Sequence, residues 1–225
     1  SILEVESLTK KTDEASFSNF NLLVNKGDKI AFLGDHKTKT LFFEVLAGNV
    51  KQDSGEFKWG ETITLSYFPT ESSMFFENDL NLIDWLRQFS DEKDENFVRG
   101  FLGRMLFSGE DSFKKVKVLS GGEKVRCLLS KMMLSSANAL IFDEPTNHLD
   151  LESIAALNDA LVAFPEVILF TTHDHTFMQT VANRIIEFTP GGIIDRSMTF
   201  DEYMENDDVR SLRDKLYGAH ERFML

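Results

Sequence analysis

The chain has 225 residues, enough for one α/β domain with a sizeable hydrophobic core. Its formal net charge of −13 argues against a broad nucleic-acid-binding face, because such faces need clustered Lys and Arg. No apolar run approaches the roughly 18 residues that span a bilayer, and the N-terminus lacks a signal-peptide pattern. A single cysteine, Cys127, excludes an internal disulfide. We therefore expect a cytoplasmic protein without membrane insertion. Because Ser1 directly precedes a strand, we also expect a fragment of a longer protein.

Strand and helix patterns alternate along most of the chain, which predicts an α/β fold with a mostly parallel sheet and flanking helices. The predicted strands lie at 2–6, 20–24 and 29–33, twice within 55–68, in the segment ALIFDEP, and at 167–171, 185–188 and 193–195. The predicted helices lie at 41–48, in the segment that LSGGEK opens, and at 153–164 and 174–181.

Two segments differ from this alternation. Residues 71–118 carry helical periodicity around the acidic run DEKDE, which indicates a small helical insertion rather than a separate domain. Residues 207–225 are charged and helical by pattern. We therefore expect one domain over residues 1–206, followed by a charged helical tail.

The segment GDHKTKTLFFEVLAG has the layout of a phosphate-binding loop. It follows an apolar strand, begins with Gly34, and leads through Lys39 and Thr40 into a helix. The pattern G-x-x-x-x-G-K-[ST] is nevertheless incomplete, because no second glycine follows and the Lys-Thr pair comes one residue early. The segment alone therefore does not decide whether this is a nucleotide site.

Two carboxylates follow the predicted strand in LIFDEP. Asp143 and Glu144 lie where the carboxyl ends of parallel strands bind ligands. Beside a phosphate loop, the first acid suits a magnesium contact and the second suits orienting an attacking water. A solvated turn would explain the pair equally well.

A helix N-terminus is predicted at LSGGEKVR. Ser120 can cap the helix, and Gly121 and Gly122 leave backbone N–H groups bare at its positive end, which suits an anion. An ordinary capped helix is the alternative, because Ser120 and Glu123 also form a capping box.

A histidine, His173, follows the next buried strand and could reach a phosphate. A lone histidine is more often structural. However, ordinary packing does not explain the complete order of a phosphate-loop-like turn, LSGGE, Asp-Glu after a strand, and a histidine after the next strand.

The chain resembles a nucleotide-binding domain of the ATP-binding cassette (ABC) superfamily. LSGGEK matches the signature motif, ALIFDE the Walker B strand, NHLD the D-loop and TTHD the switch-histidine motif. The run DEPTNHLD resembles the ABC-F branch, which consists of soluble twin-cassette ATPases that act on the ribosome. The segments FENDL, GRMLFSGED and FDEYM resemble the second cassette of such a protein. The resemblance implies a P-loop NTPase-type fold with an antiparallel β subdomain.

The resemblance also implies an ATPase that uses ATP and Mg²⁺. Its partners would be a second cassette, in the same chain or in a homodimer, and the ribosome. The implied catalytic residues are Glu144 and His173, and the implied magnesium ligands are Thr40 and Asp143. The implied nucleotide-binding residues are Gly34, Lys39, Thr40, Thr70, Ser120, Gly121, Gly122 and Asp150.

Three parts of the implied ATP pocket depart from the family pattern. Thr38 replaces the glycine before the phosphate-loop lysine, and the loop is one residue short. Residues 10–13 hold no aromatic to stack on adenine, and we interpret Phe17, the nearest one, as a core residue. Thr70 replaces the Q-loop glutamine. We therefore expect this pocket to bind ATP weakly, while the intact signature serves a partner cassette.

Three functions remain open on these residues. The first is an ABC-F ATPase cassette, since the intact Glu144 and His173 are compatible with residual hydrolysis. The second is a cassette that donates its signature without hydrolysing ATP itself. The third is the ATPase subunit of a membrane transporter.

Overall fold

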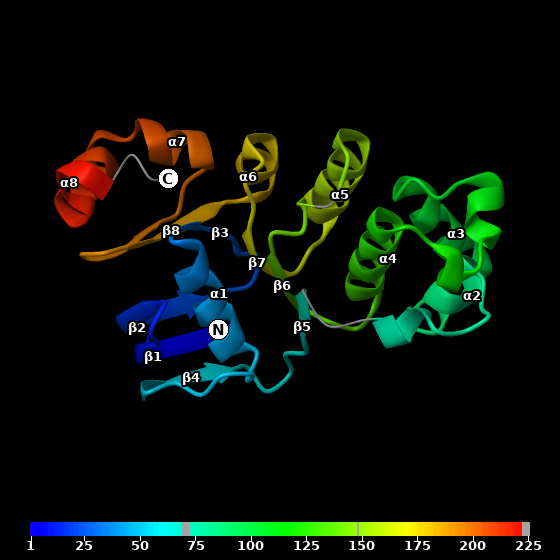
Figure 1. Cartoon of the computed structure of the whole chain (residues 1–225), viewed down its shortest axis with the longest axis horizontal. Helices are drawn as coiled ribbons and strands as arrows, with labels where there is room; N and C mark the ends of the chain where they lie inside the picture. The colour runs from blue at the N-terminus through cyan, green and yellow to red at the C-terminus, as the bar shows by residue number, and fades with distance from the viewer. Residues whose placement is uncertain (69–72, 148, 222–225) are drawn as a thin grey trace.

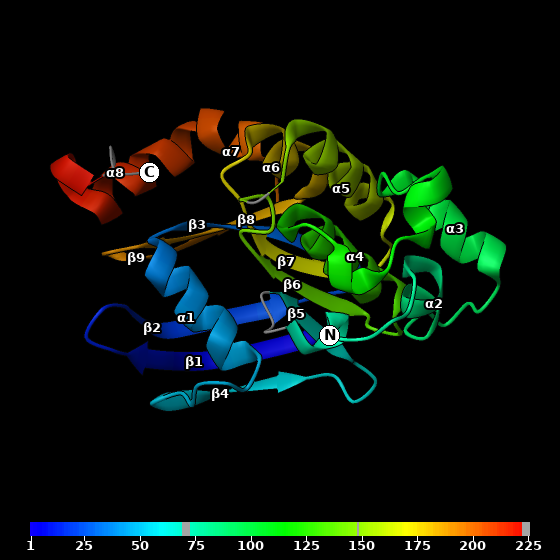
Figure 2. The same cartoon turned by 45° about the vertical axis from the view of Figure 1, so that its right-hand side comes forward.

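The computed structural model describes residues 1–68, 73–147 and 149–221 of the chain. A three-stranded sheet, helix α1, a six-stranded sheet and a group of helices follow one another as layers (Figures 1 and 2). The strands are β1 (Leu3–Lys11), β2 (Ser16–Val24), β3 (Lys29–Gly34), β4 (Ser54–Trp59), β5 (Leu65–Phe68), β6 (Ala139–Asp143), β7 (Val167–Thr171), β8 (Arg184–Thr189) and β9 (Gly192–Arg196). The α-helices are α1 (His36–Leu46), α2 (Leu82–Arg87), α3 (Glu95–Arg104), α4 (Gly121–Leu134), α5 (Leu151–Ala163), α6 (His175–Val181), α7 (Phe200–Glu205) and α8 (Asp207–Glu221).

The six-stranded sheet has the strand order β5-β6-β7-β3-β8-β9. Strands β5, β6, β7, β3 and β8 are parallel, and β9 pairs antiparallel with β8 at the edge. Every residue of β6 and β7 is buried, which explains why these strands are continuous apolar runs rather than alternating patterns. The predicted fold, a mostly parallel sheet with an added antiparallel sheet, is confirmed.

The two faces of this sheet pack against different layers. Ile141 of β6 faces α1 and the small sheet, whereas Leu140 and Phe142 face the helices α4 to α6. Phenylalanines pack on both sides of the sheet, and on the α1 side the rings of Phe20 and Phe42 lie 4.9 Å apart.

The two strands predicted within residues 55–68 belong to different sheets. Strand β4 pairs antiparallel with β1, with Phe57 opposite Val5. Strand β5 instead pairs in parallel with β6. The chain therefore crosses from the small sheet to the large one at Gly60, whose backbone N–H donates to the Ile2 carbonyl.

Residues 82–118 hold α2, α3 and two short 3₁₀ helices, Gly109–Phe113 and Val116–Val118. Arg126 of α4 fixes this insertion by donating from Nη1 to the Met105 carbonyl at 2.8 Å. Its guanidinium also lies over the Phe107 ring, 4.3 Å from the centroid. The helix that carries LSGGEK is thereby held against the insertion.

The C-terminal helices pack back onto β8 through one buried carboxylate, Glu187. It accepts hydrogen bonds from the Tyr203 hydroxyl at 2.6 Å, the Tyr217 hydroxyl at 2.6 Å and Arg213 Nε at 2.9 Å. Burial raises the pKa of both tyrosines, so their hydroxyls remain donors. The charged tail is thus anchored beside the large sheet.

Candidate nucleotide site

The connection from β3 to α1 holds one residue. β3 ends at Gly34, α1 begins at His36, and Asp35 is the N-cap between them. Gly34 has φ +109°, and a Cβ at this position would lie 2.1 Å from the Phe188 carbonyl oxygen. A glycine is therefore required here by close packing against β8. Residues 36–38, which we expected in a phosphate loop, instead form the first turn of the helix.

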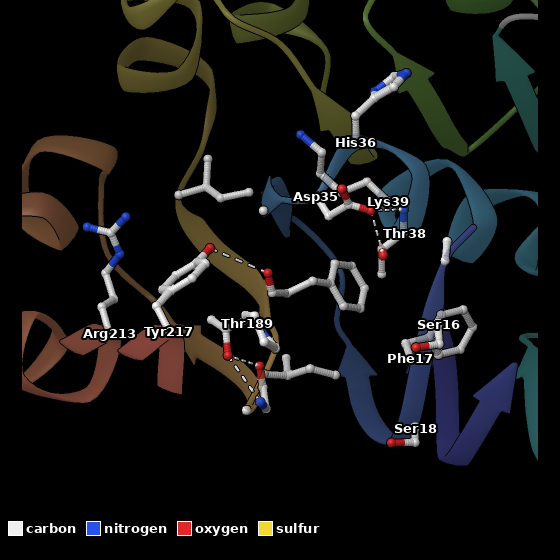
Figure 3. A pocket seen from close by; sticks show the side chains of 18 of the residues that line it. Ser16, Phe17, Ser18, Asp35, His36, Thr38, Lys39, Thr189, Arg213 and Tyr217 are labelled. Carbon is white, nitrogen blue, oxygen red and sulfur yellow. Dashed lines mark hydrogen bonds between the residues drawn. The ribbon is translucent and has the colours of Figure 1, made fainter. Parts of the chain in front are cut away.

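The N-terminus of α1 is capped by the Asp35 carboxylate. Its Oδ2 accepts from the Thr38 backbone N–H at 3.0 Å and from the Thr38 hydroxyl at 2.9 Å (Figure 3). The Lys37 ammonium lies 3.3 Å from Glu14 Oε1, and both side chains are exposed. Lys37 is therefore paired with Glu14 and does not offset the negative charge of Asp35 at this helix end. An anion site at this helix end is thus occupied by the chain's own carboxylate.

Lys39 and Thr40 lie one turn further along α1. The Lys39 side chain is buried, and within the described residues no carboxylate oxygen lies within ion-pair distance of its ammonium. Burial lowers the pKa of Lys39, and the nearby charges of Glu144, Asp143 and Asp35 oppose this shift. The Thr40 hydroxyl donates to Asp143 Oδ2 at 2.6 Å. The two predicted magnesium ligands are therefore in direct contact.

Thr171 at the end of β7 orients both acids of LIFDEP. It lies opposite Asp143 in the parallel ladder, and its hydroxyl donates to Asp143 Oδ1 at 2.8 Å. The same hydroxyl accepts from the Glu144 backbone N–H at 2.9 Å. Glu144 has φ +54°, a strained conformation for a residue with a side chain. The end of β7 thus holds Glu144 in a conformation that it would not adopt alone.

Glu144 and His173 face each other across the ends of β6 and β7. His173 Nε2 lies 3.3 Å from Glu144 Oε1, within ion-pair distance but outside hydrogen-bond geometry. Both Glu144 carboxylate oxygens are buried and lack a hydrogen-bond partner in the described part of the chain. The His173 side chain is 76% exposed. A buried, unsatisfied carboxylate next to an exposed imidazole is an arrangement suited to ordering a water molecule.

A cleft of about 1240 Å³ opens beside these groups. Its walls come from residues 11–18, the start of α1, His173, the β8–β9 turn and the C-terminal helices. Figure 3 shows Arg213 and Tyr217 of α8 on the side opposite Ser16 and Phe17. The Phe17 ring contacts Phe42 edge-to-face at 5.5 Å and is buried, which confirms our interpretation of it as a core residue.

The signature residues lie at the N-terminus of α4, on the other face of the large sheet from α1. Ser120 Oγ accepts from the Glu123 backbone N–H at 3.2 Å, and Glu123 Oε1 accepts from the Ser120 N–H at 3.0 Å. The predicted capping box is confirmed. Gly121 is exposed, and nothing lies within 4 Å of a Cβ built on it. The N-terminus of α4 is therefore open to a partner molecule, unlike that of α1.

Asp150 is placed by its local structure. It is the N-cap of α5, and its carboxylate accepts from the Ser153 N–H at 2.8 Å. Hydrogen bonds from the Ser153 side chain and backbone hold the pKa of Asp150 below its usual value. The D-loop residue His148 and the predicted Q-loop residue Thr70 lie outside the described residues.

The site offers suitable groups for Mg²⁺ but not for the phosphates of ATP. Thr40 and Asp143 supply oxygens of the kind that Mg²⁺ prefers. Within the described residues, no group of three or more His, Cys, Asp or Glu side chains is placed to hold a metal alone, so any Mg²⁺ would need further oxygen ligands. At the N-terminus of α1, no loop of backbone N–H groups precedes the helix to surround a phosphate, and the Asp35 carboxylate would repel one.

The fold, the signature helix, and the Asp143, Glu144 and His173 cluster together define an ABC-type nucleotide-binding domain. A family model described as "ABC transporter" matches residues 17–147, and the chain belongs to this family. It is 56% identical over 221 residues to the "Uncharacterized ABC transporter ATP-binding protein YkpA" of Bacillus subtilis, covering 96% of this chain and 41% of that protein.

Relatives also occur in the ABC-F branch. The "Energy-dependent translational throttle protein EttA" of Haemophilus influenzae is 33% identical over 201 residues, covering 85% of this chain and 35% of that protein. A solved dimeric ATP-binding cassette in a post-hydrolysis state, bound to ADP and Pi, matches with a TM-score of 0.66 at 16% identity. That match covers 87% of this chain and 98% of the solved one.

The chain spans about two fifths of the first curated relatives that it matches. No helix within the described residues is both long enough and apolar enough to cross a membrane.

Two contributors to the site were missed in the sequence. The phosphate-loop pattern predicts a loop at Asp35, although Asp followed by a helical pattern is a typical N-cap signal. Thr171 was noted as part of TTHD without a role. Its strand-end position next to the acids was the available signal, because neighbouring parallel strands bring their carboxyl ends together.

Proposed function

We propose that this chain is an ABC-F-type cassette that pairs head to tail with a second cassette and donates its signature motif to the partner's ATP. The supporting observation is the contrast between the two helix N-termini. That of α4 is exposed at Gly121 with its cap intact, whereas that of α1 has no phosphate loop. ATP and Mg²⁺ would then lie between the partner's phosphate loop and Ser120, Gly121 and Gly122 of this chain.

The cassette's own pocket is proposed to be impaired in ATP binding. Lys39, Thr40 and Asp143 remain in place, and Glu144 and His173 remain within 3.3 Å of each other. What this pocket lacks is the set of backbone N–H groups that surrounds a β-phosphate. Residual hydrolysis at Glu144 and His173 is the alternative, and transport in a complex with a membrane subunit is a further one.

A role in translation is proposed by similarity. EttA, 33% identical, is described as a translational throttle protein. ATP-driven closure of the two cassettes would shift a ribosome-bound state, because only the closed pair contacts ATP from both sides. The net charge of −13 leaves direct rRNA contact to other segments of such an assembly.

The test uses the complex of this chain with its partner cassette. Gly121→Leu fits the isolated fold, since nothing lies near its Cβ, yet it places a bulky group where the partner's nucleotide would approach. We expect the ATPase rate of the complex to fall at least about tenfold, equivalent to about 1.4 kcal/mol. Gly100→Leu is the matched control, because Gly100 is also helical and exposed and its Cβ also meets open space. Equal rates for the two variants would exclude signature donation.

Glu144→Gln distinguishes a cassette that hydrolyses ATP in its own pocket from one that only donates its signature motif. If the substitution lowers the ATPase rate of the complex, the chain's own pocket turns over. If the rate depends on Gly121 alone, the chain is a signature donor. A rate that appears only with added membrane subunits would favour the transporter reading.

A further inference from the structure

The Asp35 carboxylate, between β3 and α1, affects which ligands the neighbouring cleft can bind. Asp35 is the residue that connects the strand to the helix, and its carboxylate lies at the positive end of α1. Its backbone position is set by Gly34, which packs so tightly on the Phe188 carbonyl that no side chain fits there. The carboxylate is therefore held where a phosphate-binding helix would hold a phosphate oxygen.

The hydrogen bonds of Asp35 are of the kind that a bound phosphate would receive. Oδ2 accepts from the Thr38 N–H at 3.0 Å and from the Thr38 hydroxyl at 2.9 Å. A backbone N–H and a hydroxyl from the first turn of a helix are typical donors to phosphate oxygens. Thr38, which replaces a family glycine, thus has a specific use here as the second donor to the carboxylate.

The Lys39 side chain is a second, independent feature near Asp35 that favours an anion. Lys39 is 5% exposed and lines the cleft, and within the described residues no carboxylate lies within ion-pair distance of its ammonium. Desolvation of this side chain lowers the pKa of Lys39, so a nearby anion would stabilise its charged form. Asp35, Asp143 and Glu144 supply only longer-range attraction to it.

We infer that Asp35 is a specificity-determining residue that acts as a built-in phosphate substitute and excludes di- and triphosphates from the chain's own cleft. This inference rests on the proposed function, in which that cleft does not hold ATP. It goes further by assigning the exclusion to one carboxylate, rather than to the shortened backbone alone. A polyphosphate entering the cleft would compete with Asp35 for Thr38 and be repelled by its charge.

The experiment measures binding of magnesium pyrophosphate to this chain alone by isothermal titration calorimetry. Asp35→Asn removes the charge and keeps an N-cap, and Asp35→Gly removes both the charge and the competitor for Thr38. We expect both variants to bind at least about tenfold tighter than the wild type, with the glycine variant the tighter. Adding Lys39→Met to either variant should abolish the gain. A circular dichroism melt of each variant confirms that it is folded.

Two results would overturn the inference. One is folded Asp35 variants that bind pyrophosphate no better than the wild type, which would assign the exclusion to the short connection. The other is a gain that survives Lys39→Met, which would place the binding elsewhere. Neither result affects the proposed signature donation, which depends on Gly121 in the complex with the partner cassette.

Discussion

Replacing Arg213 by methionine should release α8 from the sheet. Glu187 is fully buried, and Arg213 is the cation that contacts it, with Nε 2.9 Å from Oε1. At an effective dielectric constant of about 20, this separation corresponds to a gross attraction of about 6 kcal/mol. Desolvation of both groups offsets much of it, and breaking a buried pair from one side costs about 3–5 kcal/mol. Because Tyr203 and Tyr217 still donate to Glu187, we expect the lower end, about 3 kcal/mol.

The assay is native-state amide hydrogen exchange read by mass spectrometry, which separates local opening of α8 from global unfolding. A loss of about 3 kcal/mol corresponds to an increase of about 100-fold in the exchange rate of α8 peptides, with β6 much less affected. Adding Glu187→Gln to Arg213→Met should recover most of the protection, because no uncompensated charge is then buried. Exchange of α8 within about threefold of wild type in Arg213→Met would refute the reasoning.

Two other predictions concern α4 and α5. Glu123→Gln should lower the free energy of unfolding at pH 7 by about 0.5–1 kcal/mol, because the carboxylate accepts from the Ser120 N–H and pairs with Lys114 at 3.1 Å. The Ser120 hydrogen bond lowers the folded pKa of Glu123, so this contribution is fully present above the ordinary glutamate pKa of 4.5 and is lost as the pH falls through the folded pKa. Urea titrations from pH 7 to 3 should therefore show the two proteins converging below pH 4.5. Leu151→Glu, at an 83% exposed position beside the D-loop, should weaken pairing with the partner cassette in analytical ultracentrifugation without lowering the melting temperature. Val162→Glu, at the far end of α5 and 48% exposed, is its control, and equal effects of the two would contradict a contact between the start of α5 and the partner cassette.

Local patterns were sufficient for much of the fold. The runs ALIF and VILF predict buried strands of a parallel sheet, and both lie fully buried in adjacent strands. Asp143 and Glu144 were predicted where the carboxyl ends of the parallel strands meet, and the structure places Asp143 at the end of β6 in contact with Thr40. These features depend on residues close in sequence or on the general rule that parallel strands end together.

Features that depend on distant partners could not be predicted. Nothing local distinguishes Glu187 from an exposed strand residue, because its three donors come from positions 16 to 30 residues later. The separation of β4 and β5 into two sheets is likewise decided by pairing with β1 and β6. The early start of α1 is different in kind, since the N-cap signal of Asp35 was local. The resemblance to the family's phosphate loop predicts a loop at residues 36–38, whereas α1 begins at His36.

The N-termini of α1 and α4 both carry the positive end of a helix dipole, but the charged groups around them differ. At α1 a carboxylate accepts directly from the first-turn N–H of Thr38, so the positive end carries a fixed negative charge. At α4 the group that accepts is the neutral Ser120 hydroxyl, and the nearby Glu123 charge is paired with Lys114. The α4 end therefore keeps its attraction for an external anion, while the α1 end is already neutralised. Because the two helices pack on opposite faces of the sheet, the α4 end lies away from the chain's own cleft, and in the proposed function its anion is the nucleotide of a partner cassette.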